Sequence, residues 1–97
     1  MKYIENETLE LKRSTSELKE AVISLGAMLN KHGKGTVYFG IHDDGNVLGQ
    51  QVGKSAIKDI SKAISDGIDP KVYPEIQIKK IQGKDCIVVN VNGRDNV

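Results

Sequence analysis

Glu10 and Lys12 stand two positions apart in the segment TLELK, whose side chains alternate between polar and apolar types. The alternation predicts a short strand at residues 8–12, with Leu9 and Leu11 on its buried face and Glu10 and Lys12 together on the opposite face. A glutamate can bind a divalent cation, and a neighbouring lysine can neutralise negative charge that develops on a phosphate. The pair therefore suits a nuclease site.

Residues 49–55, GQQVGKS, end like the phosphate-binding loop of nucleotide-binding proteins. That loop requires the spacing G-x-x-x-x-G-K-[ST], because successive backbone N–H groups must wrap the phosphates. Here the position five residues before Gly53 is Leu48, and Gly49 leaves only three residues between the two glycines. The stretch is instead predicted to begin a helix with Ser55 as its N-cap, and we do not expect ATP as a ligand.

Basic residues gather at three places along the chain: after the first strand, in a glycine-containing loop at 31–35, and in the C-terminal region. They are Lys12, Arg13, Lys31, His32, Lys34, Lys79, Lys80 and Lys84. Such side chains contact phosphate backbones, and these contacts position a nucleic acid without reading its sequence. Lysines near a strand edge can instead be solvated groups that deter pairing with other strands.

The composition limits the classes of protein to which the chain can belong. Its 97 residues suffice for one core, and 14 Lys and Arg against 13 Asp and Glu leave a net charge of +1. This balance excludes a uniformly basic, histone-like protein but permits a local basic patch. The single cysteine, Cys86, cannot form an internal disulfide, and no apolar run is long enough to cross a membrane. We therefore expect a cytoplasmic protein with no membrane partner.

The elements that must position these groups follow from the spacing of apolar residues. Leucine and valine at positions 18, 22, 25 and 29 predict a helix ending near residue 30, and isoleucines at 57, 60, 64 and 68 predict a second helix. Residues 8–12, 36–41, 75–81 and 86–91 predict strands, and residues 47–48 predict a short hairpin partner. The predicted order is β-α-β-β-α-β-β. We expect an α+β domain over residues 1–97, with two helices covering one face of a small mixed sheet.

Several spaced motifs resemble one known family. The segment ENETLELKRS, from Glu5, resembles the opening ESxxxEFKxS of the Schlafen AlbA_2 domain family. The segment AMLNKHGKGTVYFGIHDDG, from Ala27, resembles the AxxNTxGGxxxxGVxDDG block of that family, with one residue added before Gly40. The likeness spans about residues 5 to 91. Family members tend to continue further, so the chain is expected to be an N-terminal fragment of a longer protein.

The resemblance implies a nucleic-acid-binding domain, which in bacteria commonly stands at the N-terminus of proteins labelled as transcriptional regulators or RecG-related helicases. In the animal Schlafen relatives it also implies an endoribonuclease site of three acidic residues, which correspond here to Glu5, Glu10 and Asp43. Three carboxylates can hold Mg²⁺ or Mn²⁺. Glu5 and Glu10 are five residues apart, so on a continuous strand they would face opposite ways. Glu5 must therefore lie in a turn before the strand if it is to join the site.

Three functions remain open. The first is binding of DNA, or of structured RNA, mainly through phosphate contacts in a transcriptional regulator, with no cofactor required. The second is a metal-dependent endoribonuclease that uses Glu5, Glu10 and Asp43, with Lys12 beside them. The third is a dimerisation module whose partner surface is the edge of the C-terminal hairpin.

Overall fold

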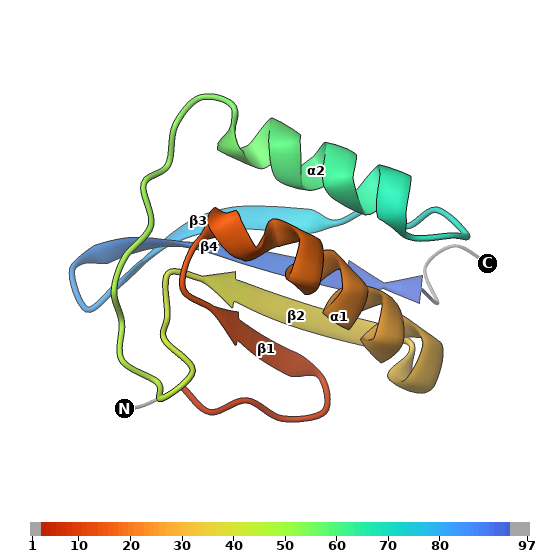
Figure 1. Cartoon of the computed structure of the whole chain (residues 1–97), viewed down its shortest axis with the longest axis horizontal. Helices are drawn as coiled ribbons and strands as arrows, with labels where there is room; N and C mark the ends of the chain where they lie inside the picture. The colour runs from red at the N-terminus through yellow and green to blue at the C-terminus, as the bar shows by residue number, and fades with distance from the viewer. Residues whose placement is uncertain (1–2, 94–97) are drawn as a thin grey trace.

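The computed structural model describes residues 3–93, which form four strands and two α-helices (Figure 1). In chain order the elements are β1 (Leu9–Lys12), the short 3-10 helix η1 (Thr15–Glu17), α1 (Leu18–His32), β2 (Lys34–Phe39), α2 (Ala56–Gly67), β3 (Glu75–Ile81) and β4 (Lys84–Asn92). The order is β-α-β-α-β-β, which is an α+β fold. None of the helices in this part of the chain is long and apolar enough to cross a membrane.

The strands form one mixed sheet in the order β1-β2-β4-β3. β1 runs parallel to β2, whereas β4 runs antiparallel to both β2 and β3. The two helices lie on the same face of the sheet, and β3 and β1 form its two borders (Figure 1). The expected architecture, two helices on one face of a small mixed sheet, is confirmed.

The extra strand expected at residues 47–48 is absent from the sheet. Ile41 and Val47 form only an isolated bridge. Gly40 has a φ of 109°, which turns the chain away from β2, and its carbonyl accepts hydrogen bonds from the N–H groups of both Leu48 (2.8 Å) and Gly49 (2.9 Å). Because two successive N–H groups converge on one carbonyl, the alternating ladder that a strand requires cannot continue.

The main core lies between the helices and the sheet. Isoleucines 60 and 64 of α2 are both 1% exposed, as their helical spacing predicts. They pack in one cluster with residues of α1, β2 and β4, which include Ala21, Leu25, Val37, Phe39, Ile87 and Val89. Ile57, predicted for the same stripe, lies in the first turn of α2 and is 39% exposed.

A second, smaller cluster lies on the opposite face of the sheet. It contains Leu11, Ile41, Val47, Ile81 and Cys86. The rings of Tyr3 and Tyr38 pack beside this cluster with their centroids 5.1 Å apart. Leu11 belongs to this opposite face, so Glu10 and Lys12 of β1 lie on the face that carries the helices.

Ser14 and Glu17 form an S-x-x-E pair before α1, a spacing that predicts a capping box, and the structure differs from this prediction. Ser14 caps η1 by accepting a hydrogen bond from the Ser16 N–H, whereas the Glu17 carboxylate accepts from the Arg13 N–H, so the reciprocal capping box does not form. α1 ends at Gly33, which has a left-handed φ of 77° and donates its N–H to the Leu29 carbonyl. Ser55 occupies the N-cap position of α2, but its side chain makes no cap hydrogen bond.

Candidate nucleic-acid and metal site

Glu5 reaches the start of β1 because the chain reverses just before that strand. Asn6 and Leu9 form a bridge, and the Asn6 side chain accepts a hydrogen bond from the Thr8 N–H at 2.9 Å. The turn brings the Glu5 carboxylate back to the strand, where its Oε2 accepts from the Leu11 N–H at 3.0 Å. The odd spacing between Glu5 and Glu10 is thereby accommodated by a turn.

Glu10 projects from β1 towards α1 and has three polar neighbours. The Ser24 hydroxyl donates to its Oε2 at 3.0 Å, and the Lys12 ammonium lies 3.8 Å from the same oxygen. Burial raises the pKa of the Glu10 carboxyl, and the adjoining Glu5 carboxyl raises it further, both by sharing a hydrogen bond and by its charge. Ser24 and Lys12 oppose this rise without cancelling it.

These groups line a pocket of about 460 Å³ at the end of β1, which we call the acidic pocket. Its polar lining consists of Glu5, Glu10, Lys12, Arg13, Glu17, His42 and Asp43. Five of the predicted site residues therefore meet in one place, and Asp43 arrives there from the turn that follows β2. His42 and Glu17 were not among the predicted site residues.

The donor set fits a divalent cation only in part. Glu5 and Glu10 adjoin each other, but Asp43 is 74% exposed and directs its Oδ1 towards the His42 Nδ1 at 2.8 Å. His42 also lies 3.2 Å from Asp44. Within residues 3–93, no three His, Cys, Asp or Glu side chains converge closely enough to hold one ion. Two carboxylates are thus in place, and the third would have to turn towards them.

Arg13 is held at the pocket rim by Glu17. The Arg13 backbone N–H donates to the Glu17 carboxylate at 3.1 Å, and the guanidinium Nε lies 3.4 Å from the same oxygen. Burial works to raise the pKa of Glu17, but the hydrogen bonds from Arg13, together with the positive charges of Arg13 and Lys12, outweigh it and the pKa falls below its ordinary value. The Arg13 side chain is 64% exposed, so its remaining donors face solvent.

The basic loop at 31–34 lies at the other end of the β1–β2 pair. Lys31 and Lys34 are exposed, and the His32 Nε2 lies 3.6 Å from the Glu7 carboxylate. The N–H of Gly33 is used in the helix cap, so a phosphate here would meet the two lysine side chains rather than that amide. Lys34 pairs with Asn92 and Lys12 with Phe39, which places the two basic groups at opposite ends of the strand pair.

The three hairpin lysines are partly engaged within the chain. The Lys84 ammonium donates to the Val47 carbonyl at 3.2 Å, and the Lys80 ammonium lies 3.8 Å from Asp85. Lys79 is exposed on β3. Lys79 and Lys80 lie on β3, the border opposite β1, and Lys84 is the first residue of β4, so the basic residues identified in the sequence do not form one continuous patch.

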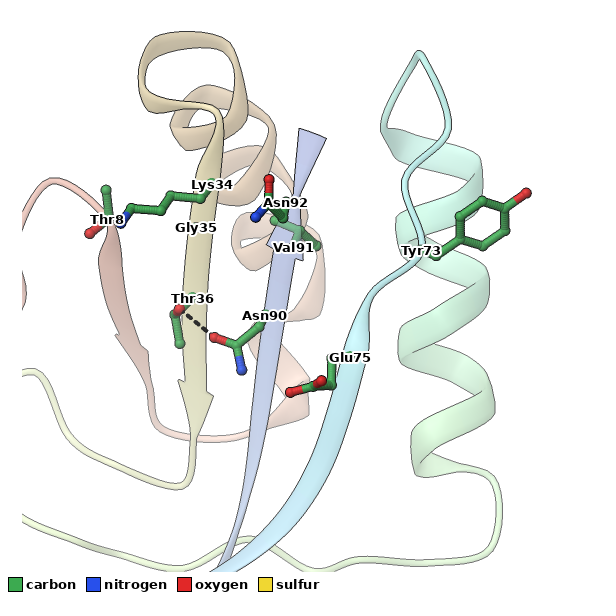
Figure 2. Close-up of a pocket in the computed structure, with 9 residues that line it drawn as sticks. All are labelled: Thr8, Lys34, Gly35, Thr36, Tyr73, Glu75, Asn90, Val91 and Asn92. Atoms are coloured by element: carbon green, nitrogen blue, oxygen red, sulfur yellow. Dashed lines mark hydrogen bonds between the residues drawn. The ribbon is translucent and has the colours of Figure 1, made fainter. Parts of the chain in front are cut away.

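A second pocket, of about 450 Å³, lies on the sheet face that the helices leave uncovered (Figure 2). Thr36 and Asn90 stand side by side on β2 and β4, and the Thr36 hydroxyl donates to the Asn90 Oδ1 at 2.6 Å. Lys34 and Glu75 border the pocket from β2 and β3 (Figure 2). This pocket was not predicted from the sequence, although the asparagines that alternate with valine at the end of β4 are a signal for it.

Comparison with known proteins defines the class of this domain. Residues 5–97 match the family described as "Schlafen, AlbA_2", and the chain belongs to that family. The fold is similar to the solution structure of the N-terminal domain of a RecG-related protein from Nitrosomonas europaea, with a TM-score of 0.51 and 22% sequence identity. That match covers 91% of this chain and 64% of the other. No curated protein matches the sequence.

Proposed function

We propose that this Schlafen AlbA_2 domain binds nucleic acid through the phosphate backbone. The observation that supports the proposal best is the placement of exposed cations at both ends of the β1–β2 pair, with Lys31 and Lys34 at one end and Arg13, beside Lys12, at the other. The structural neighbour from Nitrosomonas europaea is the N-terminal domain of a protein related to the ATP-dependent DNA helicase RecG, which is consistent with this role.

The separation of the two basic groups suits a polynucleotide. Phe39, the partner of Lys12, is five residues from Lys34, and at about 3.3 Å per residue this is roughly 17 Å. Along one strand of a duplex, phosphates rise by about 3.4 Å each, so this distance corresponds to about five phosphates. Lys34 lies on the sheet face that the helices leave uncovered (Figure 2) and Lys12 lies on the face that carries them, so a ligand that contacts both groups must pass around the β1 border and must be longer than a nucleotide.

The salt dependence of binding tests this proposal. Four phosphate contacts predict a slope of log K against log salt of about −3.6, and roughly a hundredfold loss of affinity between 50 and 200 mM salt. Fluorescence anisotropy with labelled duplex DNA and with tRNA would measure both, and would show which nucleic acid is preferred.

A double variant locates the contacts. Lys31→Ala with Lys34→Ala should lower the steepness of the slope by about two for every sequence tested. Lys62→Ala, which removes an exposed lysine from α2, is the matched control and should leave the slope unchanged. Absence of binding at 50 mM salt refutes the proposal, and an equal loss in the control variant places the contact surface elsewhere.

Metal-dependent phosphodiester cleavage is the second candidate, because Glu5 and Glu10 adjoin in a pocket that also contains Lys12. Glu5, Glu10 and Asp43 would hold Mg²⁺ or Mn²⁺, which supplies a Lewis acid that polarises the phosphodiester. Lys12 would then stabilise negative charge on the phosphate oxygens. Asp43 must first exchange its contact with His42 for the ion.

Cleavage and metal binding can be measured separately. Incubation of tRNA with the protein should produce fragments with Mn²⁺ and none with EDTA, and Glu10→Ala should abolish them while Glu20→Ala, an exposed carboxylate on α1, should not. Mn²⁺ should also raise the melting temperature of the wild-type chain but not of Glu10→Gln, because only the former holds the ion. Fragments that persist in EDTA or in Glu10→Ala rule out this candidate.

A further inference from the structure

β3 is a border strand with one side that pairs with no other strand of residues 3–93. It runs for seven residues beside β4, its one neighbour among the strands that the structure describes. Ile78 is 49% exposed on it, on the same side of the sheet as the helices. Glu75 and Lys79 are exposed on the opposite side. An uncovered edge of this length is a template for another strand.

The hairpin geometry fixes which main-chain groups point to this open edge. Ile81 and Lys84 flank the two-residue turn formed by Gln82 and Gly83, so they make the first hydrogen-bonded pair of the β3–β4 ladder. Hydrogen-bonded pairs recur at every second residue, and Gln77 is therefore bonded to β4 as well.

The main-chain groups of the residues between these hydrogen-bonded positions point to the open edge of the sheet. Ile76 and Ile78 direct their N–H and C=O groups away from β4, towards the open edge. The same alternation turns the Asp85 carbonyl on β4 away from β3, and this carbonyl indeed accepts a hydrogen bond from the Gln50 N–H at 2.7 Å.

We propose that β3 pairs with β3 of a second copy of this chain, antiparallel, about a two-fold axis through Gln77. In this register Ile76 lies opposite Ile78 of the second copy and exchanges two main-chain hydrogen bonds with it, and the symmetric pair exchanges two more. On the other side of the sheet, Glu75 lies opposite Lys79 of the second copy. The pairing thus places opposite charges face to face at both ends of the contact.

Charge and hydrogen bonding together select this register. If the numbers of two paired residues add up to an odd number, a residue whose N–H faces the open edge lies opposite one whose N–H faces β4. Such residues cannot form main-chain hydrogen bonds with each other. An axis through Ile78 places Ile76 opposite Lys80 and leaves Glu75 opposite Ile81, and an axis through Lys79 places two lysines face to face. Only the axis through Gln77 pairs isoleucine with isoleucine and glutamate with lysine.

The pairing joins two four-stranded sheets into one and leaves the acidic pocket of each copy at the far border, beside β1. Both sets of helices stay on the same face of the joined sheet, where the two α2 helices flank the seam. A single strand pair is a small interface, so the dimer should be reversible, with a dissociation constant of the order of 0.1–1 mM. This inference does not depend on nucleic-acid binding.

A cross-linking experiment tests the register. Gln77→Cys places the two introduced thiols opposite each other in a non-hydrogen-bonded pair, with Cα atoms about 4.5 Å apart, which a disulfide can span. Lys79→Cys is the matched control, because its two thiols would be offset by four residues, about 13 Å. Under mild oxidation Gln77→Cys should form at least about tenfold more covalent dimer than Lys79→Cys. Native Cys86 is fully buried and should not contribute.

Charge reversal tests the pairing without a covalent bond. Sedimentation velocity over a range of concentrations should show dimerisation of the wild-type chain, weakened roughly tenfold by Glu75→Lys or by Lys79→Glu because like charges then face each other. The double variant, Glu75→Lys with Lys79→Glu, should restore dimerisation because opposite charges again face each other. Equal cross-linking of the two cysteine variants, a monomer at all concentrations, or no recovery in the double variant would overturn the proposal. Circular dichroism confirms that each variant folds.

Discussion

Glu10 is surrounded by groups that act on its proton in opposite directions. Burial and Glu5 favour the protonated form, whereas Ser24 and Lys12 favour the carboxylate, and the pKa rises above its ordinary value of 4.5. A carboxyl with a raised pKa holds its proton more tightly in the folded than in the unfolded chain. Its contribution to the free energy of unfolding is therefore greatest below pH 4.5 and declines as the pH rises through the raised value.

Glu10→Gln should remove this decline. Glutamine carries no titrating proton and can still accept the Ser24 hydrogen bond. We therefore expect the free energy of unfolding of the variant at pH 7 to exceed that of the wild type by an amount of the order of 1 kcal/mol. The difference should close as the pH falls below 4.5. Thermal unfolding between pH 4 and pH 8 measures it, with Glu20→Gln as the exposed control. A variant that is less stable than the wild type at pH 7 would show that the charge of Glu10 stabilises the fold.

At the scale of the elements, α1 and β2 approach closely at one glycine. A methyl group at Gly35 would lie 2.8 Å from the Met28 Cβ and 2.7 Å from its Sδ. The Met28 Cβ cannot move without the helix, so Gly35→Ala should destabilise the fold by about 1–3 kcal/mol through overpacking. Gly53→Ala, where a methyl group would have no neighbour within 4 Å, should change stability little. Urea unfolding of both variants compares them, and equal stability would mean that α1 shifts away from β2 at no cost.

The elements that the sequence predicted well are those with local signals. The isoleucine spacing identified α2, and the bounds predicted for β3 agree with the structure, because periodicity and β-branched side chains act over a few residues. The strand expected at Val47 fails because its pairing depends on how Gly40 turns the chain. The 3-10 helix before α1 was likewise missed, since Ser14 and Glu17 find different partners from those of a capping box.

The candidate site was predictable in its residue types but not in its geometry. Alternation correctly placed Glu10 and Lys12 on one side of β1. The return of Glu5 depends on a bridge between Asn6 and Leu9, and the approach of Asp43 depends on the parallel pairing of β1 with β2. Parallel pairing joins segments far apart in sequence, so no local pattern reveals it.

At the scale of the whole molecule, the order of the strands predicts an order of local stability. β4 lies between β2 and β3 and contributes buried Ile87 and Val89 to the core, whereas β1 has four residues and, in the described part of the chain, a neighbouring strand on one side only. Amides that open only on global unfolding exchange slowest. The slowest amide hydrogen exchange should therefore occur in β4, and β1 should exchange faster.

Border strand β3 should show an alternating pattern of exchange. Gln77 and Lys79 donate their amides to β4 and should be protected, whereas Ile76 and Ile78 face the open edge and should exchange rapidly in dilute solution. If the strand pairs with a second copy, these two amides gain protection as the protein concentration rises. NMR-detected exchange at two concentrations measures both effects. Uniform protection along β3 in dilute solution would mean that its outer edge is already covered, and slower exchange in β1 than in β4 would contradict the stability order.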